Sequence, residues 1–430
     1  KLNGAKLKLE HDPFNYLDFS AQNRSDADLN IRKKDSSINL GLSIPINKYL
    51  TLESSFIKGN TFNISFVIGT NLNRVKLKKS KFEPQIKESR DLSEGGFYKD
   101  LTYNLNKNRL FLQTADIDSK KNELKISVTN SQHLNQIRSS SYAAEISRIT
   151  YEKHDLDINK ITVKNINVGI ETNKISFYTN HLNNQNLPVE VVKNYTKIDS
   201  GDKNSYKKHR FKPILNFPIS FNSIVPNIVS HVGSPDKFYY GGVVLQNTNE
   251  TLFSRNLILT SNIAINITNN FNETPYRPES KLPRVRTDIV KYLQGADKIY
   301  IDNAQLDYFF TPKKEVYGKI SGGIFEKMYA GIGFELIHKP YEKNFYWGVE
   351  SFYVKKRDFD QLFKTLSYKT ITSHLNFNYF YEPLEINLNL SYGKYLAEDV
   401  GYTFDISRIS KIGVRSGFFF TRTDVSAELF

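Results

Sequence analysis

The chain has 430 residues, of which 13% are aromatic and 24% charged, with a mean hydropathy of −0.48 and no cysteine. A chain without cysteine forms no disulfide and holds no thiolate metal site or cysteine nucleophile. It contains no run of about 18 apolar residues, which excludes a transmembrane helix but not membrane-spanning strands. The sequence starts at Lys1 without Met or a leader, which indicates a processed form or a fragment.

The formal net charge is +14. Lysine, asparagine and isoleucine are abundant throughout, so a biased coding composition explains this charge without any function. The alternative is a positive field that attracts an anionic partner. Nucleic acid is not expected as that partner, because the sequence has no zinc-ligand spacing or RNA-binding signature.

Residues 1–80 contain three runs in which apolar and polar residues alternate with a period of two, the spacing typical of β-strands. Breaks at residues 45–48 and 58–60 carry the Pro, Asn and Gly of hairpin turns. We predict strands of a first β-barrel here, followed by a linker over residues 74–95. The apolar positions are Ile38, Leu40, Leu42 and Ile44, then Leu50, Leu52 and Phe56, then Phe62, Ile64, Phe66 and Ile68.

Residues 96–192 mix two periods. Strand-like runs at Arg109–Asp116 and Glu123–Thr129 precede a segment in which Tyr142, Ile146 and Ile149 have helical spacing, with Asn130 or Ser131 as the cap. Strand spacing returns at Ile161–Ile170 and Lys174–Tyr178. This order predicts a small soluble β-β-α-β-β module, joined to the rest of the chain by a charged connector at residues 193–213.

Residues 205–430 return to alternation and predict a second β-barrel. One break in the pattern is residues 283–294, where Val285, Ile289 and Leu293 repeat every four residues among Arg284, Arg286 and Lys291. This is typical of a short basic amphipathic helix. Two interpretations stay open: the helix plugs or caps the end of the sheet, or it lies at a membrane surface.

The alternation is clearest in residues 316–363 and 370–421. Aromatic and aliphatic residues line one face of each predicted strand, and Gly, Asn, Thr and carboxylates line the other. A soluble sandwich also alternates, but some ten strands without a covering helix layer favour barrels with lipid outside and water inside. The predicted fold class is therefore mainly β: antiparallel transmembrane β-barrels, an inserted small soluble α/β domain and a short amphipathic helix.

Residues 283–430 contain six distinctive motifs, namely Arg286–Ile289, Tyr317–Glu326, Met328–Glu335, Lys356–Phe359, Gly393–Asp399 and Thr421–Glu428. In these motifs the sequence resembles the YjbH family of outer-membrane proteins linked to exopolysaccharide and capsule production. The resemblance implies two barrels with soluble periplasmic α/β modules between them, in the outer membrane of a Gram-negative bacterium.

The predicted function is non-enzymatic: an outer-membrane barrel that takes part in exopolysaccharide or capsule assembly or export. The alternatives are a barrel enzyme that hydrolyses lipid or glycan, and a general porin. Expected partners are an exopolysaccharide (an acidic one, if the basic charge matters), outer-membrane lipid and other polysaccharide-secretion proteins.

No catalytic residue, metal site or cofactor is predicted. Ser373 neighbours His374, but adjacent strand residues point to opposite faces, so they do not form a nucleophile–base pair. Charged sets near residues 355–360 and 394–408 are either plain surface loops or contacts to sugar groups. The candidate polysaccharide-contacting residues are Glu335, Glu350, Arg357, Asp358, Asn387, Asn389, Lys394, Arg408 and Arg415.

Overall fold

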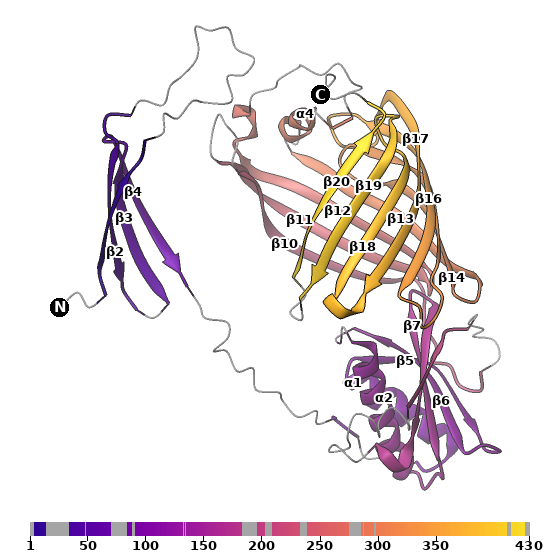
Figure 1. The fold of residues 1–430 in the computed structure, drawn as a ribbon. Coiled ribbons are helices and arrows are strands. Elements are labelled where there is room, and N and C mark those ends of the chain that lie inside the picture. Colours follow the sequence, from indigo (N-terminus) through magenta and orange to yellow (C-terminus); the bar gives the residue numbers. More distant parts are fainter. Residues whose placement is uncertain are drawn as a thin grey trace. The chain divides into compact units, whose positions relative to one another are not determined.

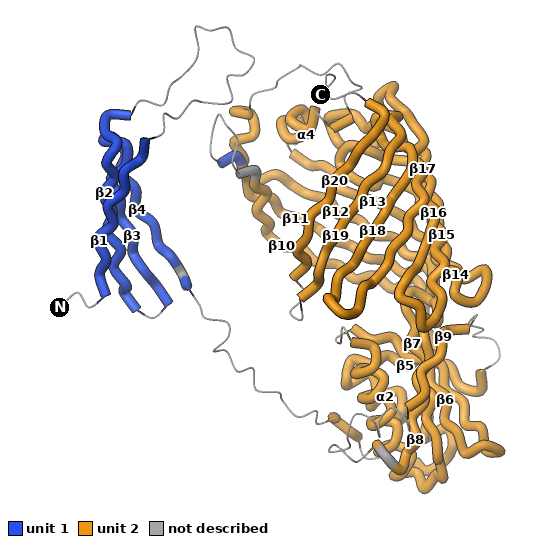
Figure 2. The backbone as a smooth tube through the Cα atoms, in the orientation of Figure 1, with its two compact units in different colours: residues 1–81, 231–240 blue, residues 82–230, 241–430 orange. Residues whose placement is uncertain are grey.

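A computed structural model of the chain forms two compact units (Figure 2), which are described separately below: residues 1–81 with 231–240, and residues 82–230 with 241–430. The structure describes residues 4–13, 34–47, 49–69, 84–87, 91–131, 133, 135–182, 196–202, 209–232, 239–274, 285–286, 288–295, 298–410 and 414–425. The candidate cap Ser131 is described, whereas most of the linker at 74–95 and Ser426–Glu428 lie outside these residues.

The first unit contains a four-stranded antiparallel sheet in the order β1-β2-β3-β4. Its strands are β1 (Lys6–His11), β2 (Ile38–Pro45), β3 (Leu50–Ile57) and β4 (Thr61–Ile68). The predicted turn after β3 is confirmed, since Lys58 and Gly59 both have positive φ, of 62° and 74°. One face carries Leu9, Leu40, Phe56 and Phe62 in register across the four strands. The three predicted strands are confirmed, and β1 is an addition.

The second unit begins with an α/β module, drawn in purple in Figure 1. Its elements are α1 (Glu94–Lys107), β5 (Leu110–Asp118), β6 (Glu123–Asn130), α2 (Gln136–Glu152), β7 (Lys160–Asn167), β8 (Ile170–Tyr178) and β9 (Thr196–Ser200). The strands pair in chain order, antiparallel except for the parallel pair β6–β7, which α2 connects. A parallel pair requires such a long crossover. The module has the best-buried core of the structure, built on Leu101, Ile126 and Ile161, each 0% exposed.

The predicted β-β-α-β-β order lacks two of these elements, α1 and β9. Helix α1 begins at Ser93, whose hydroxyl accepts a hydrogen bond from the backbone N–H of Gly96. The cap of α2 is Asn135, which accepts from the N–H of Arg138, rather than the predicted Asn130 or Ser131. Burial of Glu123 raises its pKa, but hydrogen bonds from Thr162 and Lys160 outweigh that effect and hold the pKa below its ordinary value.

The remainder of the second unit is an 11-stranded antiparallel sheet that pairs in chain order from β10 to β20. Its strands are β10 (Ile219–Val232), β11 (Tyr239–Ser254), β12 (Leu257–Asn269), β13 (Ile299–Lys313), β14 (Val316–Ile324), β15 (Tyr329–His338), β16 (Phe345–Arg357), β17 (Thr365–Tyr381), β18 (Ile386–Lys394), β19 (Val400–Ile409) and β20 (Arg415–Thr423). In Figure 1 the sheet curls, with β18–β20 drawn in front of β11 and β12.

The prediction of a mainly β chain with few helices is confirmed. Closure of the large sheet into a barrel stays a prediction, because the described residues contain no pairing between the edge strands β10 and β20. Within the described helices, none is both long and apolar enough to cross a membrane.

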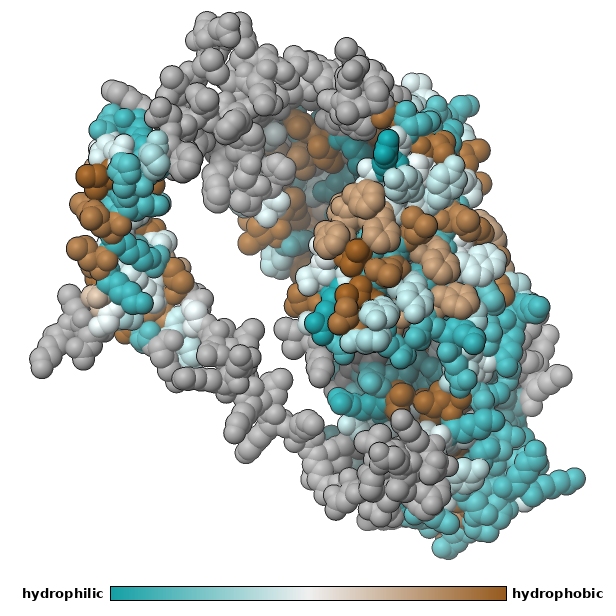
Figure 3. All heavy atoms as spheres, viewed as in Figure 1, coloured by the Kyte–Doolittle hydropathy of each residue, from teal (hydrophilic) through white to brown (hydrophobic). Residues whose placement is uncertain are grey.

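The two faces of the large sheet differ in character, and the register shows this directly. In one row, Leu336, Val349, Leu375 and Tyr392 lie opposite one another across β15 to β18. A second row contains Trp347, Phe377, Leu390, Phe404 and Phe420. We call this side the apolar face. Figure 3 looks onto the outer side of the front strands, where hydrophobic residues gather over the sheet. The apolar face is thus the outer side of the curl.

The short helix α4 (Ile289–Gln294) is the part of the predicted helix over 283–294 that the structure shows as helical. It packs against the large sheet: the Tyr292 hydroxyl donates to the backbone carbonyl of Arg357, and Tyr292 is 0% exposed. An apolar cluster surrounds it, with Met328, Tyr329 and Val354 buried and Phe352 and Phe359 packed alongside. These contacts favour the interpretation as a plug over a helix at a membrane surface.

Candidate functional site

The side of the large sheet opposite the apolar face carries a row of ionisable side chains. Lys319, Glu335, Glu350 and His374 lie directly opposite one another across β14, β15, β16 and β17. The Lys319 ammonium lies 2.7 Å from Glu335, and Nδ1 of His374 lies 3.2 Å from Glu350. We call this side the polar face. Side chains along each strand alternate between the two faces, so this period of two already predicts that Glu335 and Glu350 lie on the same face.

The polar face continues toward the edge strand β20 with amides and further charges. Asn389 lies opposite Asp405 of β19 in the register, and Asp405 accepts a hydrogen bond of 2.8 Å from Arg415 of β20. The Nε of Arg415 also donates to the Ser407 hydroxyl at 3.0 Å. Asn387 pairs with Ser407, so it shares the same side.

A cavity of about 200 Å³ opens on the polar face between these rows. Its lining includes both predicted carboxylates and one predicted amide: Glu335, Glu350, Asn389, together with Asn376, Tyr346 and Ile337. Asn376 and His374 are not among the predicted contacts. Both follow Thr372 in β17 at steps of two residues, a spacing that places them on this face. In the described residues, the Nε2 atom of His374 is buried without a hydrogen-bond partner.

Two predicted contacts lie on the other side of the sheet. Arg408 pairs with Ile386 in the register, which places it on the apolar face, where it donates to Glu385 at 2.9 Å. Lys394 lies opposite Ser373, also on the apolar-face side, with Glu398 3.8 Å away. Their assignment to a polar lumen is therefore corrected: both belong to strand ends on the side that carries the aromatic rows.

Arg357 is 1% exposed and is not available at the surface of the polar face. Its guanidinium donates to backbone carbonyl groups rather than to a carboxylate, among them Ile301 at 2.9 Å and Glu326 at 2.8 Å. Asp358 accepts a hydrogen bond from the N–H of Phe359 in the loop after β16. Arg357 is therefore engaged with the backbone of the surrounding strands and loops, whereas a sugar contact by Asp358 stays a prediction.

The end of the polar face is closed by a buried ion pair that the sequence did not suggest. Lys356 of β16 donates to Asp288 at 2.6 Å, and their side chains are only 5% and 6% exposed. A second link from the same segment is Arg286 to Glu326 at 2.8 Å, which is far more exposed. Helix α4 is thus tied to the sheet by one buried and one exposed ion pair.

The chemistry available on the polar face is hydrogen bonding to hydroxyl-rich or charged ligands. Each carboxylate has a basic neighbour, Lys319 for Glu335 and His374 for Glu350. A glycoside hydrolase instead holds one carboxyl protonated in an apolar setting beside an ionised one. Among the described residues, no group of three or more His, Asp or Glu side chains is arranged to hold a metal ion.

A family model described as "Exopolysaccharide biosynthesis protein YbjH" matches residues 2–430. The chain belongs to the YjbH family. The resemblance read from the motifs is therefore confirmed. The chain is also similar to the "Uncharacterized lipoprotein YjbH" of Escherichia coli strain K12, with 26% identity over 458 residues.

That alignment covers 98% of this chain and 60% of the relative, so the chain spans about three fifths of the relative's length. No solved structure matches the chain. The description of the YjbH family refers to exopolysaccharide biosynthesis.

Proposed function

We propose that this YjbH-family chain is a non-enzymatic outer-membrane protein that takes part in the assembly or export of an exopolysaccharide or capsule. In this proposal the large sheet closes into a transmembrane barrel, with its apolar face in lipid and its polar face in contact with the polymer. The α/β module then lies in the periplasm, where it meets other polysaccharide-secretion proteins.

The observation that carries the proposal is the exposure of the apolar face. Ile332 is 64% exposed, Ile371 52% and Phe377 45%, although each belongs to a regular strand. Soluble proteins rarely leave so continuous an apolar surface in water, because burying it is worth roughly 25 cal/mol per Å². Lipid removes that cost. The relative's description as a lipoprotein also supports a place in the bacterial envelope.

The polar face supports a saccharide as the polymer in contact. Amides such as Asn376 and Asn389, with hydroxyls such as Ser407, offer both donors and acceptors to sugar hydroxyls. Arg415 adds a fixed cation that would attract a carboxylate on an acidic polymer. Many such bonds of modest strength hold a chain without fixing it, which suits a polymer that must move.

The alternatives remain a lipid or glycan hydrolase and a general porin. The direct pairing of Glu335 with Glu350 is the feature that an enzyme would use. The contacts of both carboxylates with basic side chains, Lys319 and His374, favour binding over catalysis.

The test compares Arg415→Gln with Arg408→Gln in cells where this chain is the only copy. We expect Arg415→Gln, on the polar face, to lower surface polysaccharide, and Arg408→Gln, on the apolar face, to leave it near the wild-type level. Heat-modifiable gel mobility checks that both variants still assemble. Equal effects of the two changes would contradict the proposal, and loss of a measurable glycan- or lipid-cleaving activity in Glu350→Gln would establish the enzyme instead.

A further inference from the structure

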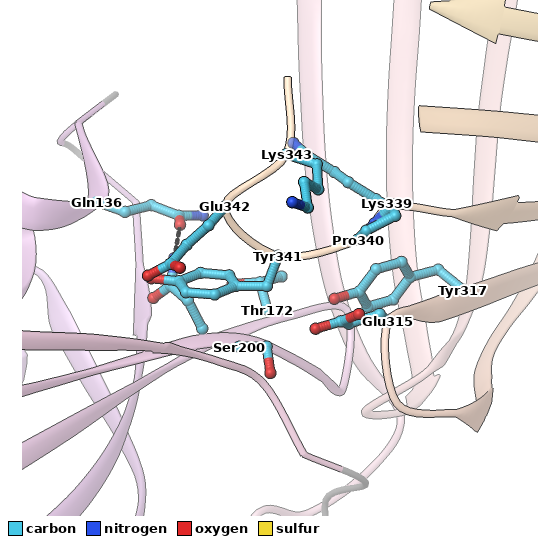
Figure 4. A pocket seen from close by; sticks show the side chains of 11 residues that line it. Gln136, Thr172, Ser200, Glu315, Tyr317, Lys339, Pro340, Tyr341, Glu342 and Lys343 are labelled. Carbon is cyan, nitrogen blue, oxygen red and sulfur yellow. Dashed lines mark hydrogen bonds between the residues drawn. The ribbon is translucent and has the colours of Figure 1, made fainter. Parts of the chain in front are cut away.

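A second cavity, of about 380 Å³, lies inside the second unit where the α/β module meets the turns of the large sheet. We call it the junction cavity. The module contributes Gln136 from the start of α2, Thr172 and Asn173 from β8, and Ser200 at the end of β9. The sheet contributes the turn after β13 and the loop Lys339–Lys343 between β15 and β16 (Figure 4). Its volume lies within the range of about 300–1,000 Å³ usual for small-molecule sites.

Aromatic rings form part of the wall of the junction cavity. Figure 4 shows the ring of Tyr341 extending from the loop toward Thr172, with Tyr317 on the other side. Burial raises the pKa of Tyr341, with Glu342 adding to the effect, so its phenol stays a neutral hydrogen-bond donor at ordinary pH. A tyrosine offers an apolar ring face and a polar tip at once. A pyranose ring matches this, because its C–H groups form an apolar face edged by hydroxyls.

The amide groups of the module are held in fixed positions. The side-chain amide of Asn165 donates to Oδ1 of Asn173 at 2.6 Å, and the side-chain amide of Asn173 in turn donates to Oε1 of Gln136. This chain of hydrogen bonds orients Gln136, and no described residue accepts from its amide nitrogen. A preoriented amide loses little conformational freedom when it binds a hydroxyl group.

The charges around the junction cavity balance. Lys339 and Lys343 face Glu315 and Glu342 in the lining, and none of these four side chains forms an ion pair within the described part of the chain. Because the positive and negative charges of this rim balance, it attracts neither cations nor anions from a distance. Recognition here therefore depends on hydroxyl contacts and ring stacking more than on net charge.

We propose that the junction cavity binds a short glycan segment, with a sugar ring stacked on Tyr341 and hydroxyls bonded to Gln136. This inference rests on the proposed function and gives the polysaccharide a second contact beyond the polar face of the sheet. It also makes the module part of the glycan path, rather than a separate domain.

The test incubates the full, detergent-solubilised chain with an array of immobilised oligosaccharides, both neutral and uronate-bearing. We expect the wild type to be retained, Tyr341→Ala to bind about tenfold more weakly, and Gln136→Ala to bind several-fold more weakly. Raising NaCl from about 0.05 to about 0.5 M shortens the Debye length about threefold but should change retention by less than twofold.

Two variants control for unspecific effects. Tyr178→Ala removes an exposed tyrosine of the same module outside the cavity. Gln113→Ala removes the hydrogen bond from Arg255 that joins module and sheet elsewhere in the junction. Both are expected to bind like the wild type.

The inference is overturned if no oligosaccharide retains the wild type, or if Tyr341→Ala binds as well as Tyr178→Ala. The two proposals fail separately. If Asn389→Ala lowers retention and Tyr341→Ala does not, the polar face keeps its proposed role and the junction cavity loses its own. If Tyr341→Ala lowers retention while Arg415→Gln leaves cellular polysaccharide unchanged, the reverse holds.

Discussion

Replacing Lys356 by Met should release helix α4 from the large sheet. The change removes the cation of the buried pair and leaves the Asp288 carboxylate, 6% exposed, without its partner at 2.6 Å. The other oxygen of Asp288 is buried and has no hydrogen-bond partner among the described residues. Breaking a buried ion pair on one side costs about 3–5 kcal/mol, because an uncompensated charge remains.

The cost should be felt locally, since α4 is short and Asp288 lies at its first turn. A local opening free energy lowered by about 3 kcal/mol corresponds to about a hundredfold faster amide exchange. Hydrogen exchange of residues 289–295, followed by mass spectrometry of the detergent-solubilised chain, measures this directly. The amides of β16 and β17 should keep their protection.

The matched control is Arg286→Gln, which breaks the exposed pair with Glu326, whose side chains are 59% and 36% exposed. Solvent-exposed pairs contribute about 0–1 kcal/mol, so exchange of α4 should rise by at most several-fold. In Asp288→Leu/Lys356→Met, two apolar side chains replace the pair, and protection should return in part. The reasoning is refuted if the exchange of α4 is unchanged in Lys356→Met, or if the double variant recovers none of the lost protection.

Three further predictions concern the sheet faces and the module. Spin labels at Phe334 and Leu388, both on the apolar face, should be more accessible to oxygen than to a water-soluble quencher. A label at Asn389, on the polar face, should be more accessible to the water-soluble quencher. Greater accessibility to that quencher at both Phe334 and Leu388 would contradict a lipid-facing surface. The module, expressed as residues 84–213 so that Phe211 keeps its stacking contact with Tyr98, should be soluble without detergent and give a mixed α/β circular-dichroism spectrum; an insoluble product would tie it to the sheet. The pKa of Glu123 is lowered in the folded module, so its ionised form stabilises the module above the unfolded pKa, and this stabilisation is lost as pH falls through the folded pKa. Glu123→Gln should therefore lower the stability of the module near neutral pH. The variant should also lose less stability than the wild type below about pH 5, as urea titrations at each pH would measure.

Alternation along single strands predicted much of the large sheet, because period two needs no knowledge of the partner strand. It placed Glu335 with Glu350, and Phe334 with Leu336, on the correct sides. The same parity was available for Arg408, which follows Tyr402, Phe404 and Ile406 at even positions, yet its charge alone suggested a lumen.

Other features depend on contacts between distant positions, which periodicity does not contain. Lys356 meets Asp288 across 68 residues, and the carbonyl groups that hold Arg357 come from separate strands and loops. Helix α1 has Phe97, Leu101 and Leu105 at four-residue spacing, but Gly95 and Gly96 at its start oppose helix formation in isolation. Packing against the module's sheet overrides that local preference.

Two glycines of the large sheet lie directly beneath aromatic rings of the neighbouring strand. A Cβ atom on Gly333 would meet the ring of Phe352 at 2.1 Å, and one on Gly318 would meet the ring of Phe310 at 2.4 Å. In each case the register sets the glycine and the ring opposite one another. The two positions of each pair are therefore sterically coupled. A larger residue at position 333 requires a smaller residue at position 352. Among homologous chains, these positions should vary jointly, and such paired changes would report the strand register without a further structure.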